Sequence, residues 1–387
     1  MPVIDAQKLI ADRAGAIRAF HLEKGILKAQ LDLSGGIDSA VMAGLLLEAL
    51  GPENVILVFS NIHSSEEACF QAWSLADALG MSFCEAPLTQ LYDGLLATFQ
   101  RSIGNMYNGH NFHPKYGEGD NPVKIGYALL KQVREEIEKD PTILGSIKST
   151  LRAPVGRAFN RMLGGIRHGT GNECEDRYIR FYQKGGDGEV DTNPIAMLSK
   201  TEVFQLAFAL GQHFAKKMGS DYPIKAYESI LEKTPTPDLL GPENPQTDEE
   251  ELMALTGVPL TYGRVAPKTG KILSFGTLER VARGFDSSLT GHGTFSGPWG
   301  FYFFTKYETG DIFHERGWVR TLFLPQLRQE NIFPQEEFTD QEVLDILQAV
   351  KKLEKATRHK MNPNIPTLGT RQDLIKAGVL TDQLTLP

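Results

Sequence analysis

The chain of 387 residues contains only three cysteines, Cys69, Cys84 and Cys174, and no two of them form a C-x-x-C pair. A disulfide framework and a cysteine-based zinc site are therefore not indicated. No apolar stretch is long enough to span a bilayer, and the first residues lack the apolar core of a signal peptide. We therefore expect a cytoplasmic protein without a membrane partner.

Basic residues are also in deficit, with 40 Lys and Arg against 48 Asp and Glu and a formal net charge of −8. Nucleic-acid-binding domains usually carry a basic surface, so a nucleic-acid partner is not expected. The hydrophobic fraction of 41% is ordinary for a globular protein, and the length allows two or three folding units. Internal repeats and low-complexity tracts are absent.

The most informative stretch is LDLSGGIDSA at residues 31–40, where a short apolar strand runs into Ser-Gly-Gly and then into a helical pattern. A glycine turn between a strand and a helix presents backbone N–H groups to a phosphate, and glycine lets the anion approach closely. A carboxylate at the helix start can hold Mg²⁺ against phosphate oxygens. A tight turn without a ligand is the weaker alternative. The candidate residues are Ser34, Gly35, Gly36, Asp38 and Ser39.

Strand and helix patterns alternate around this loop. Helices are expected at residues 5–24, 40–51 and 64–80, and strands at residues 29–33, 55–59 and 82–86. This alternation predicts the α/β class, with a doubly wound parallel sheet that binds ligands beyond the carboxyl ends of its strands.

A second block of polar motifs lies between residues 168 and 238. It contains HGTGNECED, FYQKGGDGEVDTNP, SKTE and PTPD, of which SKTE has the capping-box pattern of a helix start. A final helix is expected from Thr339 onward, closed by Arg358-His359-Lys360.

Together these motifs resemble the ammonia-dependent NAD synthetases, within the ATP-pyrophosphatase group marked by SGGxDS loops. The loop alone is shared by several nucleotide-dependent enzymes, so residues 169–201 carry the specific part of the resemblance. It implies an adenine nucleotide alpha-hydrolase-like fold, active sites at a homodimer interface, and ATP and Mg²⁺ as co-substrate and cofactor. The implied reaction is amidation of deamido-NAD to NAD by ammonia, through an acyl adenylate, with release of AMP and pyrophosphate.

The resemblance also implies roles for individual residues. ATP is contacted by Ser34, Gly35, Gly36, Asp38, Ser39, Thr170, Lys200 and Thr236. Mg²⁺ is held by Asp38 and Glu175. Deamido-NAD is contacted by Arg152, Lys184, Asp191, His359 and Lys360. At the reacting centre Lys184 supplies positive charge, and Asp187 is expected as a buried carboxylate that deprotonates ammonium or orients ammonia.

The chain departs from the family pattern in three places. Thr150 replaces an arginine that contacts the dinucleotide, one extra residue separates Glu175 from Lys184, and the strand before Gly169 is the polar GGIRH. The alternative is therefore a related adenylating ligase that acts on another carboxylate or on tRNA. Sulfur transfer would require a reactive Cys174, and a non-catalytic module would bind ATP without releasing pyrophosphate.

We expect three parts in the chain. Residues 1–258 form the synthetase-like unit, with an insertion at residues 104–126. Residues 259–338 form an aromatic-rich addition, for which core or subunit packing is favoured, and residues 339–387 form a helix and tail that contribute to the substrate site. About thirty residues precede the loop, too few for a glutaminase domain, so free ammonia or a separate partner is expected to supply the nitrogen.

Overall fold

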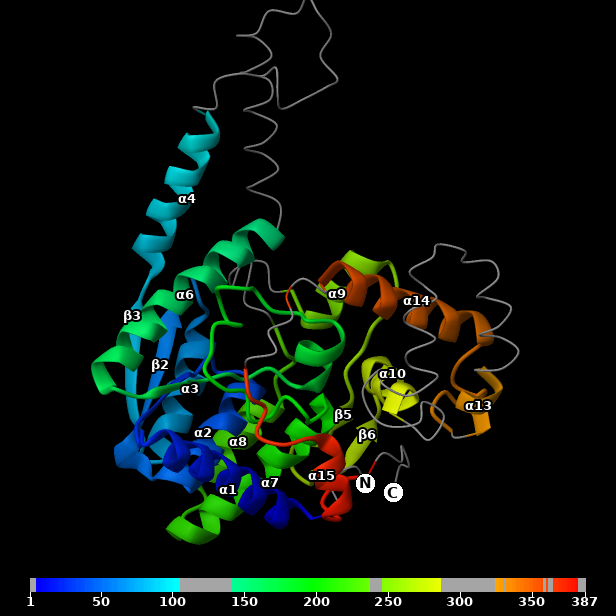
Figure 1. Cartoon of the computed structure of the whole chain (residues 1–387), viewed down its shortest axis with the longest axis horizontal. Helices are drawn as coiled ribbons and strands as arrows, with labels where there is room; N and C mark the ends of the chain where they lie inside the picture. Colours follow the sequence, from blue (N-terminus) through cyan, green and yellow to red (C-terminus); the bar gives the residue numbers. More distant parts are fainter. Residues whose placement is uncertain are drawn as a thin grey trace, which may run out of the picture.

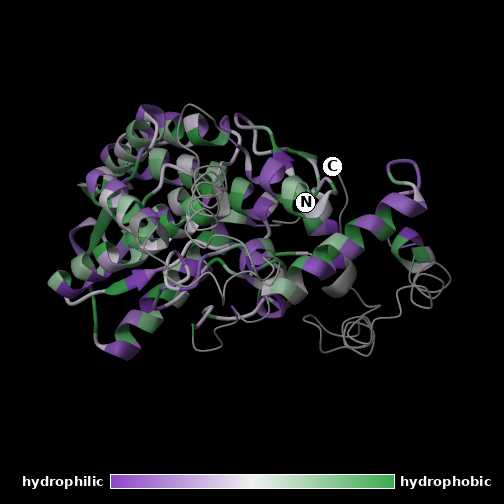
Figure 2. Cartoon of the chain, turned by 90° about the horizontal axis from the view of Figure 1, so that it is seen from above, coloured by the Kyte–Doolittle hydropathy of each residue, from purple (hydrophilic) through white to green (hydrophobic). Residues whose placement is uncertain are grey.

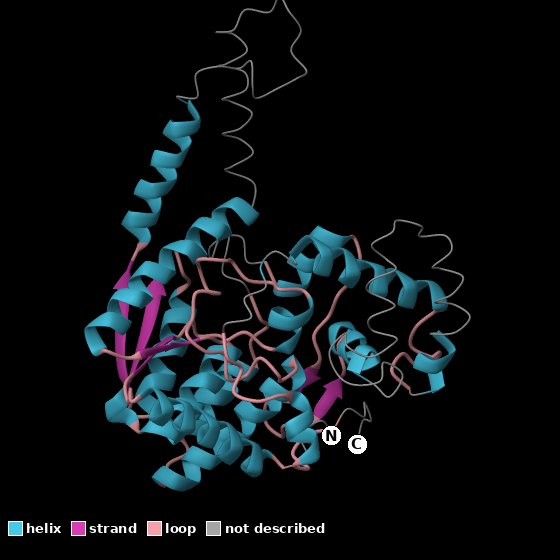
Figure 3. Cartoon of the chain, in the orientation of Figure 1, coloured by secondary structure: helices cyan, strands magenta, loops and turns pink. Residues whose placement is uncertain are grey.

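The computed structural model describes residues 5–104, 141–236, 246–286, 324–329, 331–357, 360 and 365–381. In these residues the main sheet has four parallel strands in the order β3-β2-β1-β4 (Figure 3). The strands are β1 (Ala29–Asp32), β2 (Val55–Asn61), β3 (Ser82–Pro87) and β4 (Ile166–His168). The predicted parallel α/β sheet is confirmed.

Helices cover both sides of this sheet (Figure 1). One side carries α1 (Ala6–Lys24), α2 (Ile37–Leu50), α3 (Glu66–Ala78), α7 (Lys200–Met218) and α8 (Tyr222–Leu231). The other side carries α4 (Thr89–Gly104) and α6 (Pro141–Leu163). The apolar run of β2 packs on both faces of the sheet. Leu57 lies in the hydrophobic core between the sheet and the first group of helices, which we call the first core, whereas Val58 packs under α4 and α6.

The ends of the helices follow their sequence signals. Asp5 caps α1 by accepting a hydrogen bond from the N–H of Lys8, at 2.9 Å. Gly51 ends α2, and the short helical turn η1 (Pro52–Asn54) leads into β2. The predicted capping box begins α7, since Ser199 and Glu202 bond to each other's backbone N–H groups. All the helices and strands predicted between residues 5 and 86 are present.

The order of the strands marks one end of the sheet as the ligand-binding end. β4 pairs with β1 on the side opposite β2, so the direction of strand addition reverses between β1 and β4. Ligands of such sheets bind at this reversal, beyond the carboxyl ends of the strands. The loop after β1 (residues 33–36) and the loop after β4 (residues 169–173), which runs into the turn η2 (Cys174–Tyr178), both leave the sheet there.

A second hydrophobic core lies beside the sheet and gathers helices from later in the chain (Figure 1). These helices are α9 (Asp248–Thr256), α10 (Thr277–Asp286), α13 (Leu324–Gln329) and α14 (Asp340–Thr357). Between α9 and α10, β5 (Arg264–Val265) and β6 (Ile272–Ser274) form an antiparallel pair that the sequence did not lead us to expect. α15 (Arg371–Lys376) returns to the first core.

Figure 2 shows hydrophilic and hydrophobic residues on the same turns of the helices, as amphipathic helices over a core require. None of the described helices is both long and apolar enough to cross a membrane. Most of the predicted insertion, and residues 287–323 of the aromatic-rich addition, lie outside the described residues.

Candidate functional site

The loop after β1 brings its backbone close to α3. Gly35 has a φ of +81°, and a Cβ atom there would lie 2.5 Å from the carbonyl oxygen of Ala68. The hydroxyl oxygens of Ser34 and Ser39 are 3.1 Å apart, and the N–H of Gly36 donates to Ser34 Oγ at 3.2 Å. Since Gly36 caps α2 without a side-chain hydrogen bond, N–H groups of the first turn are available to a ligand.

A cavity of about 250 Å³ opens beside this loop. Its wall combines the loops after β1 and β4 with residues from α6 and from the segment after α8. The predicted site residues that line it are Ser34, Gly35, Gly36, Arg152, Thr170, Asp187 and Thr236. Lining residues that were not predicted include Asp32, Ser60, Arg167 and Lys233. The fold therefore joins motifs from distant parts of the chain in one pocket.

Lys200, in the first turn of α7, is buried between two carboxylates. Its Nζ lies 2.6 Å from Asp38 Oδ2 and 2.9 Å from Glu175 Oε1. Burial alone would lower the pKa of Lys200, but the charges of Asp38 and Glu175 outweigh it and raise the pKa above its ordinary value. Asn172 donates to the other oxygen of Asp38, at 3.2 Å. We call Asp38, Glu175 and Lys200 the Lys200 centre.

The carboxylates of the Lys200 centre fit the ligand preference of magnesium. Enzymes bind Mg²⁺ through one or two carboxylates, and water and substrate phosphates complete the octahedron. Asp38 and Glu175 are each 16% exposed, and both place an oxygen within 2.9 Å of the same nitrogen. In the described part of the chain, no cluster of three or more His, Cys, Asp or Glu side chains could hold a metal. Phosphate oxygens would therefore have to supply further ligands.

Two more carboxyl groups interact with the Lys200 centre. Burial raises the pKa of Asp248, at the start of α9, to about 7, although Lys200 opposes part of the shift. Burial also raises the pKa of Asp176 to about 8, and the charge of Glu175 adds to the shift. Asn193 donates a hydrogen bond to Asp176. A divalent cation bound nearby would favour the charged forms of these carboxyl groups.

The prediction that Asp187 is a buried carboxylate is wrong. Its side chain is exposed, and its Oδ1 accepts hydrogen bonds from Ser149 Oγ and from the N–H of Gln183, both at 2.7 Å. The glycine-rich turn around it offers few apolar side chains to cover it. The position of the residue in the cavity wall is nevertheless compatible with contact to a substrate.

Of the two predicted dinucleotide-binding residues near the C-terminus, Lys360 lies beside the turn that carries Asp187. Lys360 Nζ donates to the carbonyl oxygen of Tyr182 at 2.7 Å, and Tyr182 Oη donates back to the carbonyl oxygen of Lys360 at 2.6 Å. Lys184 is exposed in this turn and does not line the cavity. His359 lies outside the described residues.

Asp191 is held by neighbours within the protein. Its Oδ1 lies 2.6 Å from Arg157 Nη1, and its Oδ2 accepts the N–H of Arg167 at 2.8 Å. The guanidinium of Arg167, buried in β4, pairs with Asp32 at the end of β1. The polar residues of the predicted strand GGIRH could have indicated this ion pair, because a buried charge requires a partner. Contact of Asp191 with the dinucleotide stays a prediction.

Cys174 is fully buried in the second core. Burial raises the pKa of its thiol well above the ordinary value. Reactive cysteines are accessible and have a lowered pKa, so this environment argues against sulfur transfer through Cys174. Its neighbour in that core, Tyr262, contacts the Lys200 centre, and no motif had indicated it.

His168 ends β4 directly before the second loop and is buried against His21 of α1. The two Nε2 atoms are 2.9 Å apart, and the rings stack with an angle of 6° between their planes. Burial lowers the pKa of His168 to about 3, and the charge of His21 adds to this shift. His21 Nδ1 lies 2.7 Å from the carbonyl oxygen of Ile26, so with one proton on each ring both can remain neutral.

Part of the chain matches known proteins. The NAD synthase family model matches residues 10–116 and 121–257, and so omits only residues 117–120 of the predicted insertion. An NH3-dependent NAD+ synthetase of Methanococcoides burtonii is 30% identical over 254 residues, which cover 65% of this chain and 75% of that protein. The enzyme of the same name from Archaeoglobus fulgidus is 31% identical over 248 residues, with coverage of 64% and 78%.

Solved structures also align with the chain. That of NMN synthetase from Francisella tularensis has 21% identity and a TM-score of 0.46, and the alignment covers 64% of this chain and 82% of that one. That of an NH3-dependent NAD synthetase from Campylobacter jejuni has 21% identity and a TM-score of 0.40, with coverage of 56% and 78%.

Proposed function

Because the chain belongs to the NAD synthase family, we propose that it amidates deamido-NAD to NAD with ATP and ammonia. The observation that carries this proposal is the Lys200 centre, which stands next to the loop after β1. The buried ammonium of Lys200 lies there with two carboxylates suited to Mg²⁺. Beside them is the start of α2, which has no side-chain cap. This combination suits the triphosphate of ATP, whose charge needs both positive groups and a cation.

The reaction requires activation because a carboxylate oxygen is a poor leaving group. In the first step, a carboxylate oxygen of deamido-NAD attacks the α-phosphorus of ATP, the bond from that phosphorus to the bridging oxygen breaks, and pyrophosphate leaves. In the second step, the nitrogen of ammonia attacks the acyl carbon, AMP leaves, and the nitrogen loses a proton. Both steps depend on positioning and on stabilising charge more than on covalent help from the protein.

Each group of residues in the proposed site has a separate role in these two steps. The hydroxyl groups of Ser34 and Ser39 and the first turn of α2 orient the phosphates. The ammonium of Lys200 stabilises the charge that develops on pyrophosphate. Asp38 and Glu175 would hold Mg²⁺, which would supply Lewis-acid stabilisation of the phosphates.

Thr170 and Thr236, in the cavity wall, are assigned to ATP. The remaining predicted residues are assigned to deamido-NAD. They are Arg152, Lys184, Asp191, His359 and Lys360. Among the described ones, Lys184 lies in the turn that carries Asp187, and Lys360 donates to the carbonyl oxygen of Tyr182 beside that turn.

The assembly we propose is a cytoplasmic homodimer. The three cysteines are free thiols, as expected in a reducing compartment. Large apolar side chains are exposed on α3 and α4, among them Phe70 at 63%, Trp73 and Leu91, and such groups suit a subunit contact. Light scattering is expected to give twice the chain mass of 42.8 kDa. A mass of one chain at micromolar concentration would contradict the dimer.

The direct test supplies ATP, MgCl₂, ammonium chloride and deamido-NAD, and identifies the products by mass. NAD, AMP and pyrophosphate are expected in equal amounts, and glutamine in place of ammonium is expected to give no NAD. Parallel reactions with the mononucleotide of nicotinate, or with tRNA, test the alternative. Turnover of one of these without turnover of deamido-NAD would overturn the proposal.

Asp187→Asn tests the second step. We expect amide formation to fall by about a hundredfold or more while pyrophosphate release continues, because only the second step needs a proton acceptor. An asparagine oxygen can still accept from Ser149 and from the N–H of Gln183, so the turn should be preserved. Both products are measured in the same reaction. An equal loss of both would rule out this role for Asp187.

A further inference from the structure

The family match ends at residue 257, yet a residue beyond it touches the Lys200 centre. Tyr262 precedes β5 and is 2% exposed. Its hydroxyl donates to Glu175 Oε1 at 3.4 Å, and Lys200 Nζ lies 5.0 Å from the centroid of its ring. An ammonium at this distance is attracted to the face of an aromatic ring. The phenol therefore contacts both the cation and one of the carboxylates of the centre.

Helix α10 holds the start of α7, on which Lys200 stands. Glu279 is 1% exposed and accepts hydrogen bonds from the N–H and the hydroxyl of Thr201, at 3.0 and 2.5 Å. The first N–H groups of a helix have no partner within the helix. Glu279 satisfies one of them directly after Lys200, so it fixes the direction in which α7 begins.

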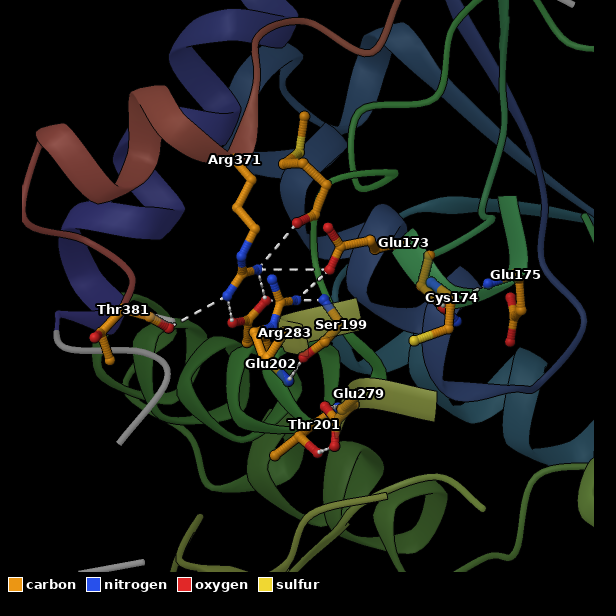
Figure 4. Close-up of polar contacts among 12 residues, drawn as sticks. Glu173, Cys174, Glu175, Ser199, Thr201, Glu202, Glu279, Arg283, Arg371 and Thr381 are labelled. Carbon is orange, nitrogen blue, oxygen red and sulfur yellow. Dashed lines mark hydrogen bonds and ion pairs between the residues drawn. The ribbon is translucent and has the colours of Figure 1, made fainter. Parts of the chain in front are cut away.

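Two buried arginines from beyond residue 257 pair with glutamates that flank the centre (Figure 4). Arg283 of α10 forms an ion pair with Glu173, two positions before Glu175. Arg371 of α15 binds both carboxylate oxygens of Glu202, at 2.6 and 2.7 Å, two positions after Lys200. Figure 4 shows these side chains converging from separate elements, with Arg371 Nη1 also 3.8 Å from Glu173 Oε2.

The burial of these charges ties the position of the site to the docking of the later helices. Both glutamates are fully buried, and the two arginines are at most 4% exposed. Removing one partner of a buried ion pair leaves the other charge without compensation, which strongly destabilises the arrangement. The turn η2, which carries Glu175, and the first turn of α7, which carries Lys200, can therefore be buried as observed only while α10 and α15 are in place.

We propose that Tyr262, Glu279, Arg283 and Arg371 are positioning residues for the Lys200 centre. On this view the segment after residue 257 completes the active site and is more than an appendage to the family fold. The proposal rests on the proposed function, because it assumes that the Lys200 centre is where ATP reacts.

The test compares two buried arginines of α10 that lie three positions apart. Arg283 pairs with Glu173 of the loop after β4, whereas Arg280 pairs with Glu337, which is 48% exposed, and with the carbonyl oxygen of Ile332 in the second core. Both arginines are at most 4% exposed, so Arg280→Met controls for the loss of a buried arginine from α10 without removing the partner of Glu173. We expect Arg283→Met to lower kcat at least about tenfold and to raise the KM for ATP, and Arg280→Met to leave both within about twofold of wild type.

Two further variants keep the test decisive if Arg283→Met does not fold. Tyr262→Phe retains the ring over Lys200 and removes the hydrogen bond to Glu175, and we expect about a three- to tenfold loss of kcat with the KM for deamido-NAD unchanged. Arg283→Lys retains the charge and should recover part of the activity. Wild-type kinetics in a folded Arg283→Met would overturn the proposal, as would equal losses in Arg280→Met and Arg283→Met. If Arg283→Met does not fold, wild-type kinetics in Tyr262→Phe would overturn it.

Calorimetric binding of a non-hydrolysable ATP analogue with Mg²⁺ separates this proposal from the proposed function. If the wild type binds the analogue but makes no NAD, the proposed function fails. Weaker binding by Arg283→Met than by Arg280→Met would then still support the positioning role, and equal binding would overturn it.

Discussion

Lys200 sets the balance of charge in the site. Without its ammonium, Asp38 and Glu175 would face each other as neighbouring like charges in a mostly buried setting. Lys200→Met is therefore expected to lower turnover by about a hundredfold or more, and to make stability depend on Mg²⁺. Melting temperatures with and without MgCl₂ should differ more in this variant than in wild type. Lys217→Met, which removes an exposed lysine beside Glu48, is the control, and an equal Mg²⁺ effect in all three proteins would contradict the metal assignment.

His168 should make stability depend on pH. Its pKa of about 3 in the folded protein lies below the ordinary value of 6.5, so between these values the unfolded chain binds a proton that the folded chain does not. This contribution to the free energy of unfolding is therefore complete above pH 6.5 and is lost as the pH falls, by about 3 kcal/mol at pH 4. His168→Gln should remove it. Urea unfolding of both proteins at pH 7 and pH 4 measures the difference, and the same pH effect in both would refute the prediction.

The loop after β1 packs directly against α3 at Gly35. Gly35→Ala combines a positive φ with a clash against the carbonyl oxygen of Ala68, which a backbone atom cannot easily relieve. We expect it to weaken ATP binding at least about tenfold and to reduce the free energy of unfolding by about 2–4 kcal/mol.

Variants of two other glycines separate the effect of the positive φ from the effect of the steric clash. Gly80 has a φ of +63° with no atom within 4 Å of an added Cβ, so Gly80→Ala should cost only about 1 kcal/mol and leave ATP binding intact. Gly36→Ala brings a Cβ only to 3.3 Å of a serine hydroxyl oxygen, so its effect on stability should be small. If Gly80→Ala weakened ATP binding as much as Gly35→Ala, the clash at the loop would not be the reason.

The elements also show what a sequence can reveal. The strands β1, β2 and β3, the capping box of α7 and the SGGxDS loop were predictable because each depends on residues close together in the chain. Seven predicted site residues meet in one cavity, and those in the loops after β1 and β4 do so because the strand order brings these loops to the same end of the sheet. The exposure of Asp187 depends on how its turn packs, and the partners of Glu173 and Glu202 come from helices that no local pattern connects with them.

At the scale of the whole molecule, two hydrophobic cores share one site. Cys174 of the turn η2 and Ile179, directly after it, pack in the second core, while Leu33 of the loop after β1 packs in the first. Binding of ATP with Mg²⁺ stabilises every part whose native position the ligand requires. We therefore expect amide hydrogen exchange to slow in α10 as well as in α2. Exchange in α4, which projects from the body, should stay unchanged (Figure 1), and protection of α2 without α10 would contradict the coupling.

The pairing of Arg371 with Glu202 has a consequence for the order in which the protein matures. Glu202 is synthesised 169 residues before Arg371, whose guanidinium group is its partner. Until Arg371 is made, burying that carboxylate would leave it uncompensated, so the first turn of α7 cannot settle in its final place. The parallel strands can assemble during translation, but the capacity to hold nucleotide should arise only when α15 docks. An interrupted chain would then be inert toward ATP, and α15 would serve as a check that synthesis of the polypeptide has reached that helix.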